Sequence, residues 1–193
     1  MVEHINREDV RRRLGRLETD YDIEYQEDAE VTVDPATFPE EVELARSGYL
    51  GSSYVWVVRK PSQTPPLTES MPAVEEERPR VLMILGRGGH AWGIPGGGRE
   101  TGETFEEGAR REVREETNIE CELTDCFGTR YEYRSAPGHD EVLHTLRVVF
   151  TGEYVGGTIA VQPGELNGAA WFAHRPSQVH PLARPVADVW FGE

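Results

Sequence analysis

GGRETGETFEEGARREVREETNI, residues 97–119, is the most informative stretch of this chain. Thr104 and Glu107 have the spacing of a capping box, in which each side chain accepts a hydrogen bond from the other residue's backbone N–H at the start of a helix. No proline interrupts the residues that follow. Apolar residues recur at every fourth position and predict one buried stripe: Phe105, Ala109 and Val113. The stretch therefore predicts a loop followed by an amphipathic helix.

The same stretch carries a group of carboxylates. Glu115 and Glu116 follow Glu112 by three and four positions, so the three side chains share one face of the predicted helix. Glu103 precedes the helix in a glycine-rich loop. Carboxylates this close together repel each other at neutral pH, and a cation would compensate them. Oxygen ligands in this number suit Mg²⁺ or Mn²⁺ rather than Zn²⁺.

The pattern resembles the Nudix box, GX5EX7REUXEEXGU, the signature of hydrolases that cleave nucleoside diphosphates linked to another moiety. The matching positions are Gly97, Glu103, Arg111, Glu112, Val113, Glu115, Glu116 and Ile119. Asn118 stands where the signature has glycine, at a position that closes the helix in a left-handed conformation, and asparagine is the next best residue there. The segment WGIPGG at 92–97 also resembles the family's WxxPGG element, which argues against the alternative of a solvated helix rich in Glu and Arg.

The resemblance covers roughly residues 50–175 and implies the α/β/α sandwich of the Nudix fold. This is an α/β (α+β) class with a mixed sheet and a central catalytic loop–helix–loop. Strands predicted before and after one central helix are consistent with it. The metal ligands that the resemblance implies are one backbone carbonyl and four carboxylates: Gly97, Glu103, Glu112, Glu115 and Glu116.

Chemistry follows from this layout of charge. Divalent ions, Mg²⁺ or Mn²⁺, would neutralise a pyrophosphate group and lower the pKa of a bound water. Arg111 is expected to orient the carboxylates through salt bridges with Glu103 or Glu107 and not to touch the substrate. The candidate catalytic residues are Glu112, Glu115, Glu116, Glu165 and Arg111.

The general base has several candidates. We favour Glu165, in a loop where the family often places this residue. Glu112 and Glu116 are alternatives within the box, and Asp140 and Glu141 lie in another loop.

Substrate contacts are expected from the glycine-rich passage 86–98. Its glycines allow the backbone to approach a phosphate closely. Arg87 and His90 flank the passage and could meet phosphates, although loop surface is an equal interpretation for both. The candidate substrate-binding residues are Arg87, Trp92, Gly96 and Gly98.

The identity of the substrate depends on features outside the box. Pro137 lies near the proline that ADP-ribose pyrophosphatases carry downstream, so ADP-ribose, cleaved to AMP and ribose 5-phosphate, is the favoured substrate. Nucleoside triphosphates, oxidised ones included, are the second choice, and dinucleoside polyphosphates the third. A nucleotide-binding regulatory module without catalysis is the alternative of another class, but such modules typically lose carboxylates that are present here.

Composition bounds the partners. The 193 residues carry a formal net charge of −15, so binding to nucleic acid or RNA end processing is not expected. Lys60 is the single lysine, and an acidic, lysine-poor chain is typical of a high-salt cytoplasm, although an acidic protein from a GC-rich genome is the alternative. Cys121 and Cys126 have no zinc-site spacing and are expected to be buried thiols. No signal peptide or membrane span is predicted, so we expect a cytoplasmic protein with a small-molecule nucleotide substrate.

We divide the chain into an N-terminal extension, residues 1–48, and a Nudix hydrolase domain, residues 49–193, with a Pro/Glu-rich loop at 60–80. The extension resembles segments that some Nudix enzymes use to form a homodimer. A helix capped by Asn6 and Asp9 is expected to open it, with a solvated arginine run at 11–13. Short strands are predicted around 23–25, 31–33, 53–59, 81–85, 120–126, 127–133 and 143–151, and a C-terminal helix is expected to be broken by Pro185.

Overall fold

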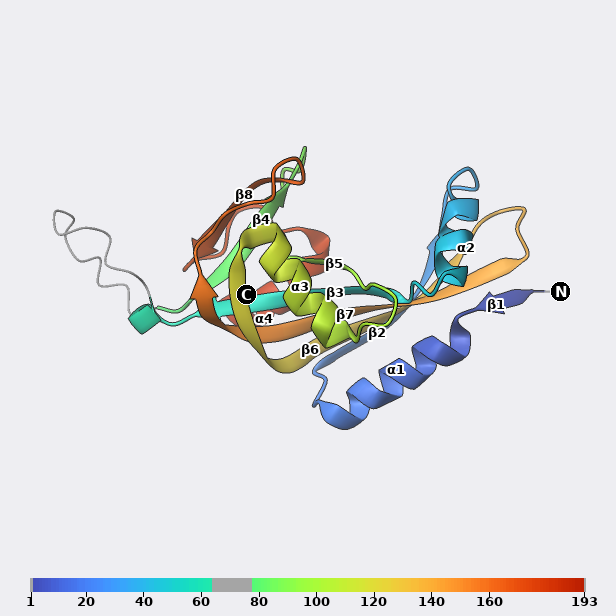
Figure 1. The fold of residues 1–193 in the computed structure, drawn as a ribbon, viewed down its shortest axis with the longest axis horizontal. Helices are drawn as coiled ribbons and strands as arrows, with labels where there is room; N and C mark the ends of the chain where they lie inside the picture. Colours follow the sequence, from blue (N-terminus) through green and yellow to red (C-terminus); the bar gives the residue numbers. More distant parts are fainter. Residues whose placement is uncertain (1, 64–77, 193) are drawn as a thin grey trace.

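The structure, a computed structural model, describes residues 2–63 and 78–192. Figure 1 shows the strands and helices of these residues, which alternate up to β3 and include three consecutive strands after α3. The strands are β1 (Glu3–Ile5), β2 (Tyr25–Thr32), β3 (Gly51–Arg59), β4 (Arg80–Gly86), β5 (Gly96–Gly98), β6 (Ile119–Ser135), β7 (Glu141–Gly157) and β8 (Leu166–Phe172). The helices are α1 (Arg7–Asp20), α2 (Phe38–Arg46), α3 (Phe105–Thr117) and α4 (Arg184–Phe191), with short 3₁₀ turns at Pro61–Gln63 and Pro181–Ala183.

One mixed sheet organises the described residues. Its main path runs in the order β2-β6-β7-β3-β4-β8, with β1 paired to β7 and β5 paired to β3. The β3–β7 and β2–β6 pairs are parallel, whereas β6–β7, β3–β4 and β4–β8 are antiparallel. A mixed sheet with helices confirms the predicted fold class.

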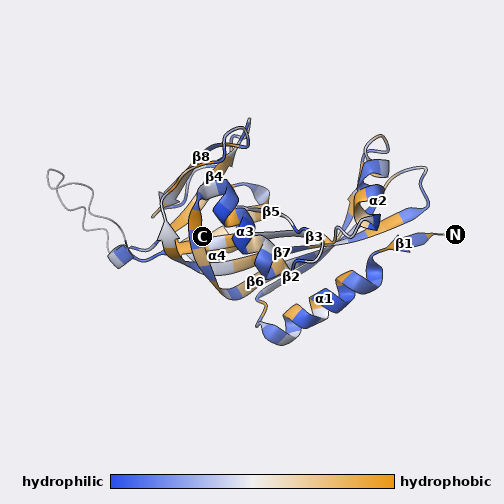
Figure 2. Cartoon of the chain, viewed as in Figure 1, coloured by the Kyte–Doolittle hydropathy of each residue, from blue (hydrophilic) through white to orange (hydrophobic). Residues whose placement is uncertain are grey.

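The two faces of the sheet are covered by different helices. In β3 the side chains of Val55 and Val57 point to the face that packs against α3, and Trp56 points to the face that packs against α4. This explains why the strand has no polar alternation, because both of its faces are buried. Figure 2 shows apolar residues on the strands and a mostly hydrophilic α1.

The helix α3 packs with the stripe predicted for it. Phe105, Ala109 and Val113 are all buried in the core between α3, α1 and the sheet. Burial of these side chains stabilises the helix, and it leaves the opposite face of α3 for its carboxylates.

The prediction that Pro185 breaks a C-terminal helix is wrong. Pro185 lies in the first turn of α4 and the helix continues to Phe191. Proline lacks a backbone N–H, and the first turn of a helix has no acceptor for that N–H within the helix, so proline is well tolerated there.

The prediction of separate strands at 120–126 and 127–133 is also wrong. Both segments belong to β6, which pairs with β7 over its whole length, and the register shifts between Cys126 and Gly128. A β-bulge of this kind bends a strand without ending it. Likewise, the two short strands predicted at 23–25 and 31–33 are replaced by one strand, β2, which pairs continuously with β6 from Tyr25 to Thr32 and leaves Ile23, Glu24 and Val33 outside it.

The N-terminal residues join the same sheet. The helix α1 forms as predicted, but its expected cap does not. Asn6 adopts a left-handed conformation with φ 65° and makes no side-chain cap; its Nδ2 donates to the carbonyl oxygens of Ala45 and Tyr49 at 2.8 and 2.9 Å. Asp9 forms an ion pair with Arg12. Asn6 therefore connects α1 to the end of α2, a tertiary role that local sequence does not reveal.

Two further predictions concern the chain's organisation. The division at residue 48 stays a prediction, and most of the predicted Pro/Glu-rich loop at 60–80 lies outside the described residues. Within the described ranges no helix is long and apolar enough to cross a lipid bilayer. Both cysteines are free and buried, as expected.

Candidate active site

Local interactions fix both ends of α3. The Thr104 side chain accepts a hydrogen bond from the Glu107 N–H at 3.1 Å, and the Glu107 carboxylate accepts one from the Thr104 N–H at 2.8 Å. The predicted capping box is therefore confirmed. At the other end Asn118 adopts the left-handed conformation, with φ 57°, that glycine has in the signature. The substitution preserves the helix end.

The glycine-rich strand β5 lies against the carboxylates of α3. The Gly96 N–H donates to the Glu116 carboxylate at 2.9 Å. A methyl group at Gly97 would lie 2.7 Å from an oxygen of Glu112. Because β5 is paired with β3, the sheet holds this loop in place. The loop and the helix thus bring the predicted Gly96, Gly97, Glu112 and Glu116 together.

Arg111 is bonded to several of the predicted metal ligands. Its Nε lies 2.9 Å from Glu103, and its Nη1 lies 2.8 Å from Glu112 and 3.0 Å from Glu115. Its Nη2 donates to the Gly98 carbonyl at 2.9 Å. Glu107, the other partner considered for Arg111, is the capping residue of α3. Arg111 therefore contacts carboxylates on both the loop and the helix.

Burial and charge separate the pKa values of these carboxylates. Hydrogen bonds from Arg111 lower the pKa of Glu103. Burial raises the pKa of Glu112, although Arg111 opposes the shift. Burial also raises the pKa of Glu116 to about 7, and the negative charges of Glu112 and Glu165 add to the effect. Among the described residues the Glu116 carboxylate accepts one hydrogen bond, from the Gly96 N–H, and has no cationic side chain as an ion-pair partner.

The chemistry of this donor set fits a hard divalent cation. Glu112 and Glu116 offer carboxylate oxygens beside a glycine-rich turn, and Mg²⁺ and Mn²⁺ prefer oxygen ligands. A half-buried carboxylate without a cationic partner is costly, and a bound cation would remove that cost. Within the described residues, however, no three His, Cys, Asp or Glu side chains form a ready-made metal site. Arg111 explains this arrangement, because it occupies oxygens of Glu103, Glu112 and Glu115.

The remaining candidates lie at different distances from this centre. Glu165 is exposed and close enough for its charge to raise the pKa of Glu112 and Glu116. Arg87 is near Glu165 in the structure, since its N–H donates to the Glu165 carbonyl and its Nη1 to the Gly164 carbonyl. Trp92 packs edge-on against Phe172, with ring centroids 4.7 Å apart. Trp92 is partly buried and packs against the core cluster that includes Val186 and Ala187 of α4.

Other predicted residues lie away from the carboxylates. His90 is exposed in the loop after β4. Asp140 lies beside β1, where its carbonyl accepts from the Glu3 N–H, and Glu141 is 3.7 Å from Arg46. The roles of all these residues stay predictions.

Several residues that support the site were not predicted. Arg13 of α1 donates to the Glu103 carbonyl at 3.2 Å, and Arg16 lies 2.8 Å from the buried Glu106 of α3. The buried Arg99 donates to the carbonyls of Glu103 and Gly48. The arginine run at 11–13 predicts a solvated face, and its spacing alone does not reveal that Arg13 contacts the loop before α3 or that Arg16, one turn later, contacts α3 itself.

Comparison with known proteins places these observations in a family. Residues 68–188 match the model of the NUDIX domain. The chain is similar to the NAD-capped RNA hydrolase NudC of Pseudomonas entomophila, with 34% identity over 88 residues, which are 46% of this chain and 29% of the relative. NudC of Deinococcus radiodurans is 39% identical over 74 residues, or 38% of this chain and 23% of the relative. The chain thus spans only about a quarter of the length of these relatives.

The fold is similar to that of solved Nudix structures. A hydrolase of the NUDIX family from Clostridium perfringens superposes with a TM-score of 0.50 at 15% identity, covering 73% of this chain and 95% of that structure. The predicted membership of the Nudix family is confirmed by the match of residues 68–188. The chain belongs to the NUDIX domain family.

Proposed function

We propose that this chain is a divalent-metal-dependent hydrolase that cleaves the pyrophosphate linkage of a nucleoside diphosphate derivative. The observation that carries the proposal is the convergence of Glu112 and Glu116 on the Gly96–Gly97 backbone, with Arg111 bonded to the flanking carboxylates. A substrate with two adjacent phosphates needs both cations and a backbone that allows close approach. The glycine-rich backbone allows the close approach, and the carboxylates would hold the cations.

The chain's own residues have distinct tasks in this proposal. Glu103, Glu112, Glu115 and Glu116, with the Gly97 carbonyl, would hold Mg²⁺ or Mn²⁺, which when bound neutralises the pyrophosphate and lowers the pKa of a bound water. Arg111 orients the carboxylates through its ion pairs and does not contact the substrate.

We assign the proton-accepting role to Glu165. Its negative charge contributes to the raised pKa values of Glu112 and Glu116, so it lies near both carboxylates. Its side chain is exposed in the loop before β8, where it could accept a proton from a water near the phosphorus. Glu112 and Glu116 are in direct contact with the loop and are better suited to hold the cation. The Asp140 carbonyl accepts a hydrogen bond from Glu3 of β1, and Glu141 lies 3.7 Å from Arg46 of α2, which is why we favour Glu165 over these two residues.

ADP-ribose, giving AMP and ribose 5-phosphate, is our first choice of substrate. The similarity to relatives named NAD-capped RNA hydrolase supports a substrate in which AMP is joined through pyrophosphate to a second group, and NAD shares that half with ADP-ribose. NADH is therefore the second compound to test, and nucleoside triphosphates are the third.

The test is a hydrolysis panel with product masses, run with Mg²⁺, with Mn²⁺ and with EDTA, at low and at molar KCl because of the acidic composition. AMP and ribose 5-phosphate from ADP-ribose, lost in EDTA, are the expected result. Glu116→Gln should lower kcat by about 10²-fold or more, with an unchanged circular dichroism spectrum. Glu165→Gln should change the pH–rate profile.

The outcomes separate the alternatives. Pyrophosphate released from a triphosphate would replace the first-choice substrate with the triphosphate class. Nucleotide binding without hydrolysis of any compound would establish the regulatory module instead. A homodimer is a separate proposal, and light scattering that shows a monomer at high salt would contradict it.

A further inference from the structure

Neighbouring cavities extend from Gly96, in the glycine-rich segment before α3, to the part of the sheet formed by β2, β6 and β7. Three cavities of about 290, 250 and 360 Å³ lie along the sheet, and Arg147 lines all of them. The middle cavity reaches Gly96, which is bonded to Glu116. It shares His180 and Leu182 with the first cavity. The first cavity, which we call the ring cavity, therefore adjoins the catalytic loop through the middle one.

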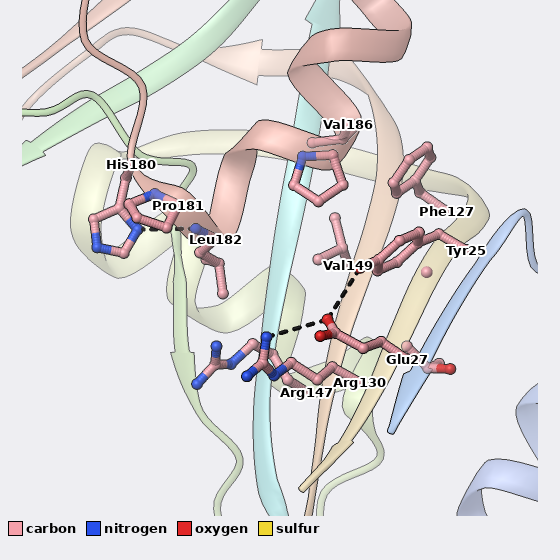
Figure 3. A pocket seen from close by; sticks show the side chains of 13 residues that line it. Tyr25, Glu27, Phe127, Arg130, Arg147, Val149, His180, Pro181, Leu182 and Val186 are labelled. Carbon is pink, nitrogen blue, oxygen red and sulfur yellow. Dashed lines mark hydrogen bonds and ion pairs between the residues drawn. The ribbon is translucent and has the colours of Figure 1, made fainter. Parts of the chain in front are cut away.

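The ring cavity has aromatic and aliphatic walls. Figure 3 shows Tyr25 of β2 and Phe127 of β6 on the right, Leu182 of the 3₁₀ turn Pro181–Ala183 on the left, and Val186 of α4 above them. The rings of Tyr25 and Phe127 are nearly parallel, with an interplanar angle of 11° and centroids 6.4 Å apart. Val149 lies between the two walls in the view. Flat apolar walls around a small volume suit a planar ring.

Two arginines, Arg130 and Arg147, are among the residues that line the ring cavity. Arg130 and Arg147 are direct neighbours across the β6–β7 pair, and their guanidinium groups lie close together in Figure 3. Like charges opposite each other are unfavourable, so a compensating anion is needed. The buried carboxylate of Glu132 provides it, at 3.1 Å from Arg130 and 3.2 Å from Arg147.

The compensation is shared among three cations. Glu132 also lies 2.9 Å from Arg134, so one carboxylate serves three guanidinium groups. Arg130 has a second partner in Glu27, at 3.1 Å, and Arg134 has one in Glu41. For Arg147, Glu132 is the sole carboxylate within ion-pair distance among the described residues. Arg147 can therefore accept a further anion beside the ring cavity.

We propose that the ring cavity is the subsite for the nucleobase of the substrate, that Tyr25 determines how tightly the base is held, and that Arg147 binds the adjoining phosphate. A planar ring next to an anion is the chemistry of a nucleotide, and the middle cavity leads from that phosphate position to the carboxylates of α3. Glu27, which accepts a hydrogen bond from the Tyr25 hydroxyl at 3.0 Å, lies where it can also accept one from an N–H group of the base.

This subsite uses residues that precede the matched family region. Tyr25 and Glu27 belong to β2, whereas the family model matches residues 68–188. The N-terminal residues thus contribute directly to substrate selection. The proposal rests on the proposed function only in calling the occupant a substrate, because binding of a nucleotide can be measured without turnover.

The test measures binding of AMP, GMP, CMP and UMP to Glu116→Gln protein by calorimetry, with ribose 5-phosphate as the compound that lacks a base. Tyr25→Ala should weaken binding of the preferred nucleotide about five- to a hundredfold, the range for loss of a base–aromatic stack. Ribose 5-phosphate should bind no differently to Tyr25→Ala. Tyr25→Phe keeps the ring and should stay within about threefold of the parent.

Two further variants protect the interpretation. Val189→Ala changes an exposed residue of α4 that does not line the cavity, and it should leave binding unchanged. Tyr25→Leu keeps an apolar wall without the ring, so it tests stacking if Tyr25→Ala fails to fold. Arg147→Gln should weaken the binding of AMP and leave the binding of adenosine unchanged, because adenosine has no phosphate.

Each outcome is decisive. Equal affinity of the preferred nucleotide for the parent, Tyr25→Ala and Tyr25→Leu would overturn the subsite, as would the absence of binding by all four nucleotides. Binding that depends on Tyr25, together with no hydrolysis of any compound by the parent enzyme, would leave the subsite intact and refute the proposed function. Hydrolysis with a KM that is indifferent to Tyr25 would do the reverse.

Discussion

Replacing Gly97 by alanine is the sharpest test of how the loop and α3 form one site. The Gly97 backbone is outside the left-handed region, so alanine can adopt its conformation. Its new Cβ would lie 2.7 Å and 2.9 Å from the two carboxylate oxygens of Glu112. An ordinary contact begins at 3.4 Å, so the nearer oxygen must retreat by 3.4 − 2.7, or about 0.7 Å. The three atoms nearest to the new Cβ all belong to the Glu112 carboxylate, so this group takes the main perturbation.

Activity and stability should respond very differently. A shift of about 1 Å in a positioned group costs on the order of 10²-fold in rate. The clashing atoms are the end of a flexible side chain, which can rotate away at a cost of about 1 kcal/mol or less. We expect kcat on the best substrate of the hydrolysis panel to fall about 30- to 300-fold, with a free energy of unfolding close to that of the parent.

A double-mutant cycle attributes the loss to Glu112. Kinetics are measured for the parent, Gly97→Ala, Glu112→Ala and the double variant, at saturating Mg²⁺, with urea unfolding of each protein. If Gly97→Ala acts by displacing Glu112, it should have almost no additional effect once Glu112 is alanine. Full additivity of the two losses, or a Gly97→Ala enzyme with more than about half of the parent kcat, would refute the reasoning.

Two predictions concern stability. Burial, with the nearby His4, Arg7 and Arg11, lowers the pKa of His144 from 6.5 to about 4. As the pH falls from 6.5 towards 4, His144 is therefore protonated in the unfolded chain but stays neutral in the folded chain. The free energy of unfolding should fall by up to about 3 kcal/mol over this range. His144→Gln should remove this fall. This expectation is contradicted if urea unfolding gives the same difference in free energy between parent and variant at pH 7 and at pH 4.5. Asn118→Ala should cost about 1 kcal/mol because of its left-handed φ of 57°, whereas Asn118→Gly should be nearly neutral even though both lose the hydrogen bond to Thr158. Thermal unfolding that ranks alanine equal to glycine would exclude backbone strain as the cause.

The helix α3 could be predicted because its signals are local. The Thr104–Glu107 box, the apolar stripe and Asn118 each act within one or two turns of the chain, and each is present in the structure. Spacing within a helix also determines which side chains share a face. The arrangement of Glu112 and Glu116 next to the glycines of 96–98 followed from these signals and from the family pattern.

Where a residue's partner is distant in sequence, prediction failed. Asn6 has the residue type of a helix cap, but its amide is taken by the carbonyls of Ala45 and Tyr49. The break predicted at Pro185 is wrong for a different reason. A proline ends a helix only when it lies inside the helix, and the sequence does not show that α4 begins at Arg184, one residue earlier. The two halves of β6 read as separate strands because pairing with β7 tolerates a bulge at the boundary.

The charged cluster beside the ring cavity illustrates the same limit. Arg147 lies in the apolar run 143–151, and nothing in that run indicates what the side chain faces. Only the pairing of β6 with β7 places it opposite Arg130 and within reach of Glu132. The register of β6 against β7 thus brings Arg130, Glu132 and Arg147 together as two cations around one buried carboxylate.

The contacts of α1 bear on the role of the first 48 residues. Arg16 provides the cationic partner of Glu106, which is buried in the first turn of α3, and Arg13 holds the carbonyl of Glu103. A chain that began after residue 48 would lose the cation that pairs with Glu106, and with Arg16 and Tyr21 it would lose the side chains that contact this carboxylate. The change would fall on the first turn of α3 and on the loop that contains Glu103, next to the candidate metal-binding carboxylates. Together with Tyr25 in the ring cavity, these contacts mean that the N-terminal residues stabilise the catalytic helix from one face of the sheet and line the cavity on the other.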